Sequence, residues 1–221
     1  MSSRMRTSLR LAVAGVLVAT LASPGLARAG AEASLPAADE TPAWEWGPSV
    51  LFYVLRDEPS YVQPTLTVDR GALHLEGRYN YEAKDTGSVW VGWNFSFGEE
   101  MKLGLTPMVG GVCGRMNGIS PGLTLTLEWG PVAFWSQGEY VFDLADFSRS
   151  YFYAWSELSV TGPDWLRVGL ALQHTRVFET STQLQGGPLV GFAFWKLSTT
   201  VYFFAPGQQD QFVVLALSGT F

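Results

Sequence analysis

The sequence is poor in cysteine and histidine, the residues that most often form disulfides and bind metal ions. Its only cysteine is Cys113, so no intramolecular disulfide is possible. The thiol is expected either to sit idle in a loop or to bridge to another molecule. Two scattered histidines add no metal-ligand spacing, and the short pairs Gly110-Gly111 and Gly186-Gly187 do not form a phosphate-binding loop. The sequence therefore predicts neither a metal site nor a cofactor.

Positive charge is also scarce, and much of it lies at the start of the chain. MSSRMRTSLR carries three arginines, an apolar run follows from about residue 11 to 22, and Ala27-Arg28-Ala29 fits a small-x-small cleavage site. This pattern is typical of a secretory signal peptide, because the apolar run is too short to span a bilayer. We predict a signal peptide over residues 1–29 and a flexible lead-in on the periplasmic side over residues 30–43.

Removing residues 1–29 takes away four arginines and no acid, which leaves 10 basic and 20 acidic residues and a net charge of −10. Nucleic-acid binding needs a basic footprint, so nucleic acid is not expected as a partner. The remaining lysines are Lys84, Lys102 and Lys196.

Long apolar runs and helical periodicity are absent after the signal peptide; what is present is alternation with a period of two. In the stretch LHLEGRYNYE, Leu73, Leu75, Tyr79 and Tyr81 share one parity. His74, Glu76, Arg78 and Asn80 share the other. About twelve strands are expected between residues 44 and 221, centred on Phe52, Thr65, Arg78, Trp93, Leu105, Leu125, Gln137, Trp155, Leu170, Val190, Val201 and Leu215.

The connections alternate between tight and longer. Tight turns are expected at residues 69–71, 98–100, 130–131, 162–164 and 195–196, each joining an even strand to the next odd one. Longer loops are expected at EAKDTGS, GGVCGRMNGIS, DLADFSRS and VFETST. Membrane barrels combine an even strand count with short turns on the periplasmic side and longer loops outside.

Three features favour polar side chains inside a barrel over a soluble β-sandwich. The polar parity is rich in Thr, Ser, Gly, Asn and Gln and poor in the lysines of solvated sheets. Aromatic residues gather near strand ends, as in the two interfacial girdles of a membrane protein. The girdle expected at the short-turn end includes Trp129, Trp165, Trp195 and Phe221, and Tyr79, Tyr81, Tyr140, Phe142 and Phe152 are expected at the other.

The chain ends in VVLALSGTF, with Val213, Leu215, Leu217 and Phe221 on one parity. This terminus resembles the C-terminal β-signal of bacterial outer-membrane β-barrels, except that Gly219 stands where a hydrophobic residue or Tyr is usual. The resemblance implies a closed, transmembrane, antiparallel up-and-down β-barrel over residues 44–221, exported to the cell outer membrane. It also implies contact with membrane lipid and lipopolysaccharide and insertion by the barrel-assembly machinery. It indicates no oligomeric state.

A barrel of about twelve strands has a narrow interior. The charged residues expected to line it are Glu76, Arg78, Lys102, Glu128, Glu139, Glu157 and Arg167. Glu157 and Arg167 are expected to meet across adjacent strands. Two interpretations fit: a structural ion network that fills the interior, or a charged constriction that selects solutes.

The outer half of the interior is expected to be aromatic, with Trp90, Tyr151, Tyr153, Trp155, Tyr202, Phe204 and Phe212 on the inward parity. These rings fit either a ligand-stacking vestibule or simple packing.

Catalysis is not predicted, because neither histidine has a nucleophile at an obvious partner position. Barrel phospholipases carry a His-x-Ser pair, whereas the residue two places after His174 is Arg176. We predict a narrow passive channel or solute-binding pore for small polar molecules. The alternatives are a closed structural or surface-interaction barrel and, third, a lipid-active enzyme.

Overall fold

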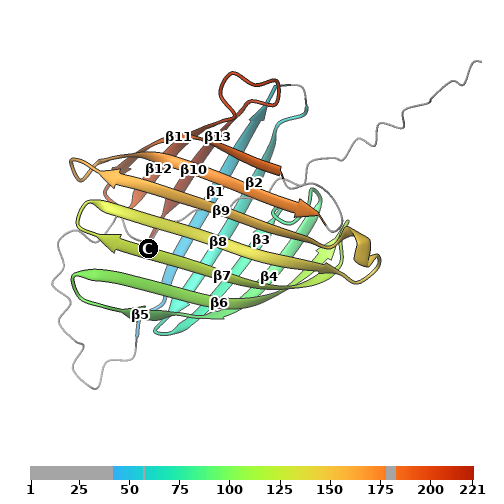
Figure 1. The fold of residues 1–221 in the computed structure, drawn as a ribbon. Helices are drawn as coiled ribbons and strands as arrows, with labels where there is room; N and C mark the ends of the chain where they lie inside the picture. The colour runs from blue at the N-terminus through green and yellow to red at the C-terminus, as the bar shows by residue number, and fades with distance from the viewer. Residues whose placement is uncertain (1–41, 57, 178–182) are drawn as a thin grey trace, which may run out of the picture.

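The computed structural model describes residues 42–56, 58–177 and 183–221, which form a single closed sheet (Figure 1). Each strand pairs with its sequence neighbours, except that β4 and β5 both pair with β6 and not with each other; β1 pairs with β13, so the ring closes. The strands are β1 (Glu45–Leu55), β2 (Tyr61–Arg70), β3 (Leu73–Tyr79), β4 (Thr86–Trp93), β5 (Phe95–Phe97), β6 (Met101–Gly114), β7 (Gly118–Trp129), β8 (Val132–Asp143), β9 (Tyr151–Thr161), β10 (Leu166–Val177), β11 (Gln183–Phe194), β12 (Leu197–Phe204) and β13 (Phe212–Gly219).

Strands β4 and β5 are two parts of one pass across the barrel. Both pair with β6, and the break falls at Asn94, whose backbone N–H donates to Ala72 instead of to a ladder partner. Every pairing is antiparallel, and the predicted all-β barrel of about twelve strands is confirmed. The one helix among the described residues is a 3₁₀ turn, η2 (Phe147–Arg149), in the connection between β8 and β9. No described helix has the length and apolar character to cross a membrane.

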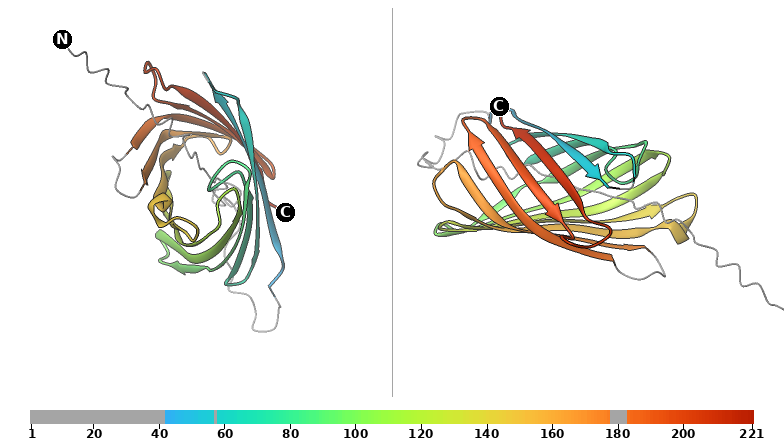
Figure 2. Two further views of the ribbon diagram at one scale, coloured as in Figure 1. Left: turned by 90° about the vertical axis from the view of Figure 1, so that its right-hand side faces the viewer. Right: turned by 90° about the horizontal axis from the view of Figure 1, so that it is seen from above.

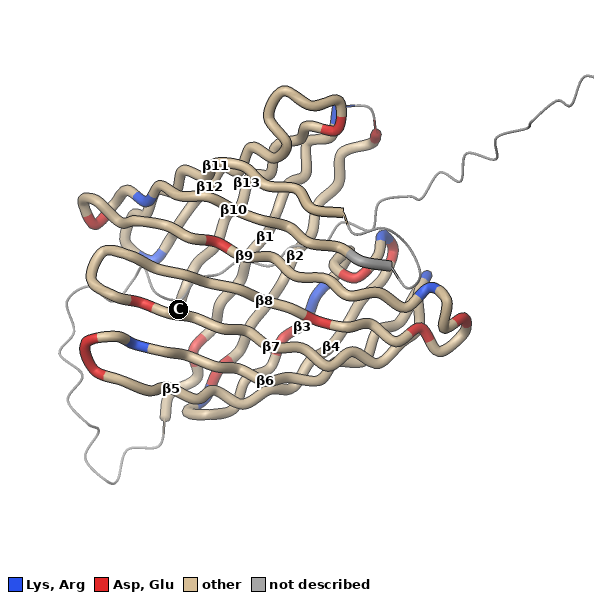
Figure 3. The backbone as a smooth tube through the Cα atoms, in the orientation of Figure 1, with Lys and Arg blue, Asp and Glu red and all other residues tan. Residues whose placement is uncertain are grey.

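The outer face of the ring is apolar and exposed, whereas the inner face is buried. Val89, Val91 and Trp93 alternate along β4 with the buried Ser88 and Trp90, and Val89 exposes 71% of its side chain. Acidic and basic residues concentrate in the connections, and the strand middles carry few of them (Figure 3). A soluble sheet would bury its apolar parity, so this arrangement suits hydrocarbon outside the ring.

Two details of the predicted strand pattern are wrong. The stretch GGVCGRMNGIS was expected to be a long loop, but β6 runs to Gly114 and β7 begins at Gly118. The ladder continues through both, because Gly111 pairs with Val89 on one side and Ile119 on the other. Tyr81 was expected to face lipid with Tyr79, but its side chain is wholly buried inside the ring.

The predicted signal peptide and most of the lead-in lie outside the described residues, as does most of the loop VFETST.

Candidate functional site

The connection between β3 and β4, residues 80–85, turns into the barrel. Asn80 and Asp85 both have positive φ, 58° and 61°, so the backbone reverses without continuing the strand parity. Asn80 holds this geometry through its side chain, which donates to the Val62 carbonyl and accepts from the Asp85 N–H. Tyr81 and Glu82 are thereby buried with no exposed surface. The left-hand view of Figure 2 looks into the barrel, and this teal-green connection lies within the outline of the barrel.

Tyr81 reaches from this turn to the opposite wall. Its hydroxyl donates to the side-chain oxygen of Gln137 on β8 over 2.7 Å, and its ring packs edge-on against Tyr153 of β9. The hydroxyl of Tyr151 donates back to the Glu82 carbonyl. The turn is therefore bonded across the interior of the barrel and narrows it.

The guanidinium of Arg78 forms the centre of a buried ion cluster. It donates to Glu76 over 2.8 Å and to Glu139 over 2.9 Å, and it lies 3.7 Å from Glu82. We call these four residues the Arg78 cluster. All four side chains are buried, so the cluster is shielded from bulk solvent.

Two aromatic rings pack against the Arg78 guanidinium. Its carbon lies 4.0 Å from the centre of the Tyr81 ring and 4.2 Å from that of Trp90. The Trp90 indole N–H donates to the Ser88 hydroxyl. The indole N–H and the Ser88 hydroxyl each also donate to the Glu82 carboxylate. Cation–π contact adds to the ion pairs here, because both rings and the charge are desolvated.

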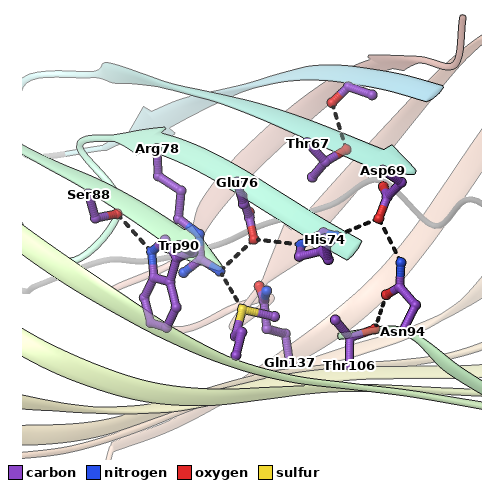
Figure 4. A network of polar contacts seen from close by, with 12 residues as sticks. Thr67, Asp69, His74, Glu76, Arg78, Ser88, Trp90, Asn94, Thr106 and Gln137 are labelled. Carbon is purple, nitrogen blue, oxygen red and sulfur yellow. Dashed lines mark hydrogen bonds and ion pairs between the residues drawn. The ribbon is translucent and has the colours of Figure 1, made fainter. Parts of the chain in front are cut away.

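A chain of polar side chains runs from the Arg78 cluster toward the short-turn end of the barrel (Figure 4). His74 lies between Glu76, at 3.6 Å, and Asp69, at 2.8 Å. Asn94 donates to the same Asp69 oxygen and accepts from Thr106. Asp69 exposes 30% of its side chain, so this chain connects solvent at the short-turn end with the cluster in the interior.

A second ion pair lies apart from the first. Arg167 of β10 donates to Glu157 of β9 over 2.9 Å and to Thr200 of β12 over 3.1 Å. Glu157 also accepts hydrogen bonds from Trp155 and Tyr202, so both of its carboxylate oxygens are bonded. The pair has one acid for one base. The strand spacing had predicted this meeting of Glu157 and Arg167.

An aromatic layer fills the outer half of the interior. Trp155 packs edge-on against Tyr202 and Phe204, and Phe204 stacks on Phe212. These rings pack against one another and against the turn at residues 80–85, and they have almost no exposed surface. The layer comprises Trp90, Tyr151, Tyr153, Trp155, Tyr202, Phe204 and Phe212, the rings expected from the sequence to point inward.

The remaining predicted residues lie at the short-turn end. Lys102 is exposed and Glu128 half-buried; they face each other across β6 and β7, and neither takes part in an ion pair recorded for the described residues. Trp129, Trp165, Trp195 and Phe221 are exposed, as expected of a girdle, although their contact with lipid stays a prediction.

The groups weighed for catalysis are separated. His74 bonds to carboxylates, whereas His174 packs its ring against Phe152. Cys113 is exposed in the outer part of β6, outside any loop. Among the described residues, no group of three or more His, Cys, Asp or Glu is arranged to hold a metal ion.

Sequence reasoning missed Glu82 as a site residue, along with Gln137, Ser88 and Asp69. Glu82 has the inward parity of the strand that precedes it, but it was assigned to the loop EAKDTGS. The usable signal was Asn80, just before that loop, since Asn adopts positive φ more readily than most residues and so marks a reversal.

The ring, its apolar outer face and its polar interior define the class: a transmembrane β-barrel of the bacterial outer-membrane type. No protein-family model matches the sequence, and no curated protein is similar enough in sequence to be matched. Solved structures do match. KdgM porin is similar with a TM-score of 0.59 and 10% identity, over 79% of this chain and 99% of that chain.

A second structure, of KdgM porin in complex with disordered oligogalacturonate, gives a TM-score of 0.58 at 9% identity over the same shares of the two chains. The outer membrane protein Omp33 of Acinetobacter baumannii matches more weakly, with a TM-score of 0.44 and 10% identity over 82% of this chain and 100% of that chain. At these identities the likeness concerns the fold alone.

Proposed function

We propose that this protein is a narrow passive channel of the outer membrane for small polar solutes. The observation that carries the proposal is a closed ring with a polar chain inside it, from the partly exposed Asp69 to the buried Arg78 cluster. Burying so many charged groups costs folding free energy, which a purely structural barrel could avoid with an apolar interior. The fold shared with KdgM porin supports the same function.

The turn at residues 80–85 and the aromatic layer form the constriction of this channel. Solutes approach it through the polar short-turn half and pass it when the side chains of the turn move aside. Oligogalacturonate, an acidic sugar chain present in one KdgM structure, is not the solute we propose, because the interior of this barrel carries more acids than bases.

Planar bilayer recording tests the channel directly. The folded protein is expected to give small, discrete conductance steps. Tyr81→Ala removes a ring that spans the interior, so the step is expected to grow by about twofold or more. Tyr79→Ala is the matched control, because this neighbouring tyrosine is exposed on the outer face and its loss leaves the step unchanged. A folded sample that gives no steps, with or without Tyr81, would overturn the proposal.

A closed structural barrel is the second candidate, and the wholly buried aromatic layer favours it. In that case the loops at the outer end carry the function, through contact with lipopolysaccharide or a protein partner. The two candidates separate in the same recording, since a closed barrel stays silent even when Tyr81 is truncated.

A further inference from the structure

We propose that passage through this barrel favours cations over anions, and that Glu82 and Glu139 set the preference. The inference rests on the proposed channel and adds the class of solute that the channel takes. Three observations support the inference: buried acids outnumber buried bases, two carboxylate oxygens have no hydrogen-bond partner, and these acids lie at the constriction.

The charges of the Arg78 cluster do not cancel. Three carboxylates, those of Glu76, Glu82 and Glu139, face the single guanidinium of Arg78 within 3.7 Å. A further base, His74, contacts Glu76, and it is itself paired with Asp69. With His74 counted as a base, four acidic side chains face two basic ones, so acidic groups are in excess at this level of the interior.

The cluster also has unused acceptors. Glu82 Oε2 and Glu139 Oε1 are buried and have no hydrogen-bond partner among the described residues. The hydroxyl of Tyr153, which lies directly across from Glu139 on the next strand, is buried without a partner as well. Arg78 Nε is also buried without a partner, so the cluster does not satisfy all of its own polar atoms. Buried polar atoms are almost always bonded, so the unpaired oxygens point to a donor or a cation as their transient partner.

The position of the cluster gives these charges their effect on permeation. Glu82 belongs to the turn that narrows the barrel, and both carboxylates are shielded from bulk water. Charges at a desolvated constriction act on a passing ion through a low effective dielectric, whereas surface charges are screened by salt within about 10 Å. The excess negative charge at this level therefore outweighs the charges of the exposed loops.

The second ion pair provides the contrast within the same barrel. Glu157 faces Arg167 one to one, and both of its oxygens accept hydrogen bonds. This pair has one acid for one base and leaves no carboxylate oxygen unpaired, so it contributes little preference for either sign of ion.

Reversal potentials in planar bilayers with a tenfold KCl gradient test the inference. The wild-type channel is expected to pass K⁺ in preference to Cl⁻. Glu82→Gln with Glu139→Gln leaves Glu76 and Arg78 as a balanced pair, so the permeability ratio of K⁺ to Cl⁻ is expected to fall by about fivefold. Glu99→Gln is the control, because it removes one charge from an exposed turn, and its ratio should match the wild type.

The outcomes separate the two proposals. A folded wild-type protein that conducts without preferring K⁺ overturns the inference and leaves the channel standing. A preference that survives the double substitution also overturns it. The wild-type reversal potential decides by itself if the double variant does not fold, since a value at zero or on the anion side contradicts the argument. Silence of the folded wild type overturns the proposed channel.

Discussion

Arg78 balances more negative charge than it carries, and this makes it the residue on which the interior most depends. Replacing Arg78 by Gln leaves Glu76, Glu82 and Glu139 close together without a counter-charge. Removing one partner of a buried ion pair typically costs about 3–5 kcal/mol, because the remaining charge stays desolvated. We expect Arg78→Gln to lower the free energy of unfolding by about that amount, measured by urea unfolding of the barrel in detergent micelles.

Arg115→Gln is the control for the loss of a positive charge. Arg115 lies in an exposed connection, and a surface substitution of this kind changes stability by about 0.5 kcal/mol or less. If Arg78→Gln were as mild as Arg115→Gln, the three carboxylates would have to be solvated, and the account of a dry interior would be wrong.

At the same scale, sequence parity placed individual side chains well wherever the strand is regular. Glu76, Arg78, Glu139, Glu157 and Arg167 all follow from alternation, and all are buried in the ring. Parity fails one residue after Asn80, because a positive φ resets the direction in which the next side chain points. The partner of each charge could not be predicted at all, since contacts such as that of Arg78 with Glu139 join strands far apart in sequence.

Among the elements, the turn at residues 80–85 determines how wide the interior is. Asn80 supplies the positive φ and two hydrogen bonds that hold the turn inward, one to Val62 and one from Asp85. Asn80→Ala loses both bonds and strains the backbone, at a cost of about 2–3 kcal/mol for the turn. The turn is then expected to leave the interior more often, which frees the backbone around the exposed Lys84 to enter a protease active site.

Limited trypsin digestion of the folded barrel measures this release. Cleavage after Lys84 is expected to be at least about tenfold faster in Asn80→Ala than in the wild type, given the estimated cost for the turn. Asn117→Ala is the matched control, because the side chain of that asparagine makes long bonds of 3.4 and 3.5 Å in the neighbouring connection, and its 2.9 Å backbone bond survives the substitution. Equal cleavage rates in all three proteins would show that Asn80 does not hold the turn.

Elements built on glycine were the hardest to delimit from the sequence. The stretch from Gly110 to Gly118 has the composition of a loop, and its high glycine content lowers any strand expectation. In the barrel, the inward Trp90 ring requires a small residue at two positions on the neighbouring strands. A Cβ on Gly110 would overlap this ring, and one on Gly122 would meet it at 3.0 Å. Trp90 thus explains Gly110 and Gly122, a reason that no local pattern contains.

For the whole molecule, closure depends on the two ends of the chain. The backbone of Trp46 exchanges both hydrogen bonds with Phe221, at 2.8 and 2.9 Å, beside the ladder of β1 and β13. The predicted closed barrel requires its first and last strands to pair, and β1 and β13 do so. Gly219, which departs from the β-signal pattern, lies under the Phe221 ring, and a Cβ there would approach that ring to 2.8 Å.

The Phe221 side chain can be separated from this closure. Phe221→Ala keeps both backbone bonds with Trp46, and the ring is half-exposed, so stability in micelles is expected to change by about 1 kcal/mol or less. If the terminal ring is read by an assembly machinery, the same substitution sharply lowers the amount of barrel inserted in cells. Trp129→Ala removes another exposed ring at the same end and should insert normally. Equal losses in both variants would assign the effect to the interfacial girdle, and normal insertion of Phe221→Ala would contradict the β-signal prediction.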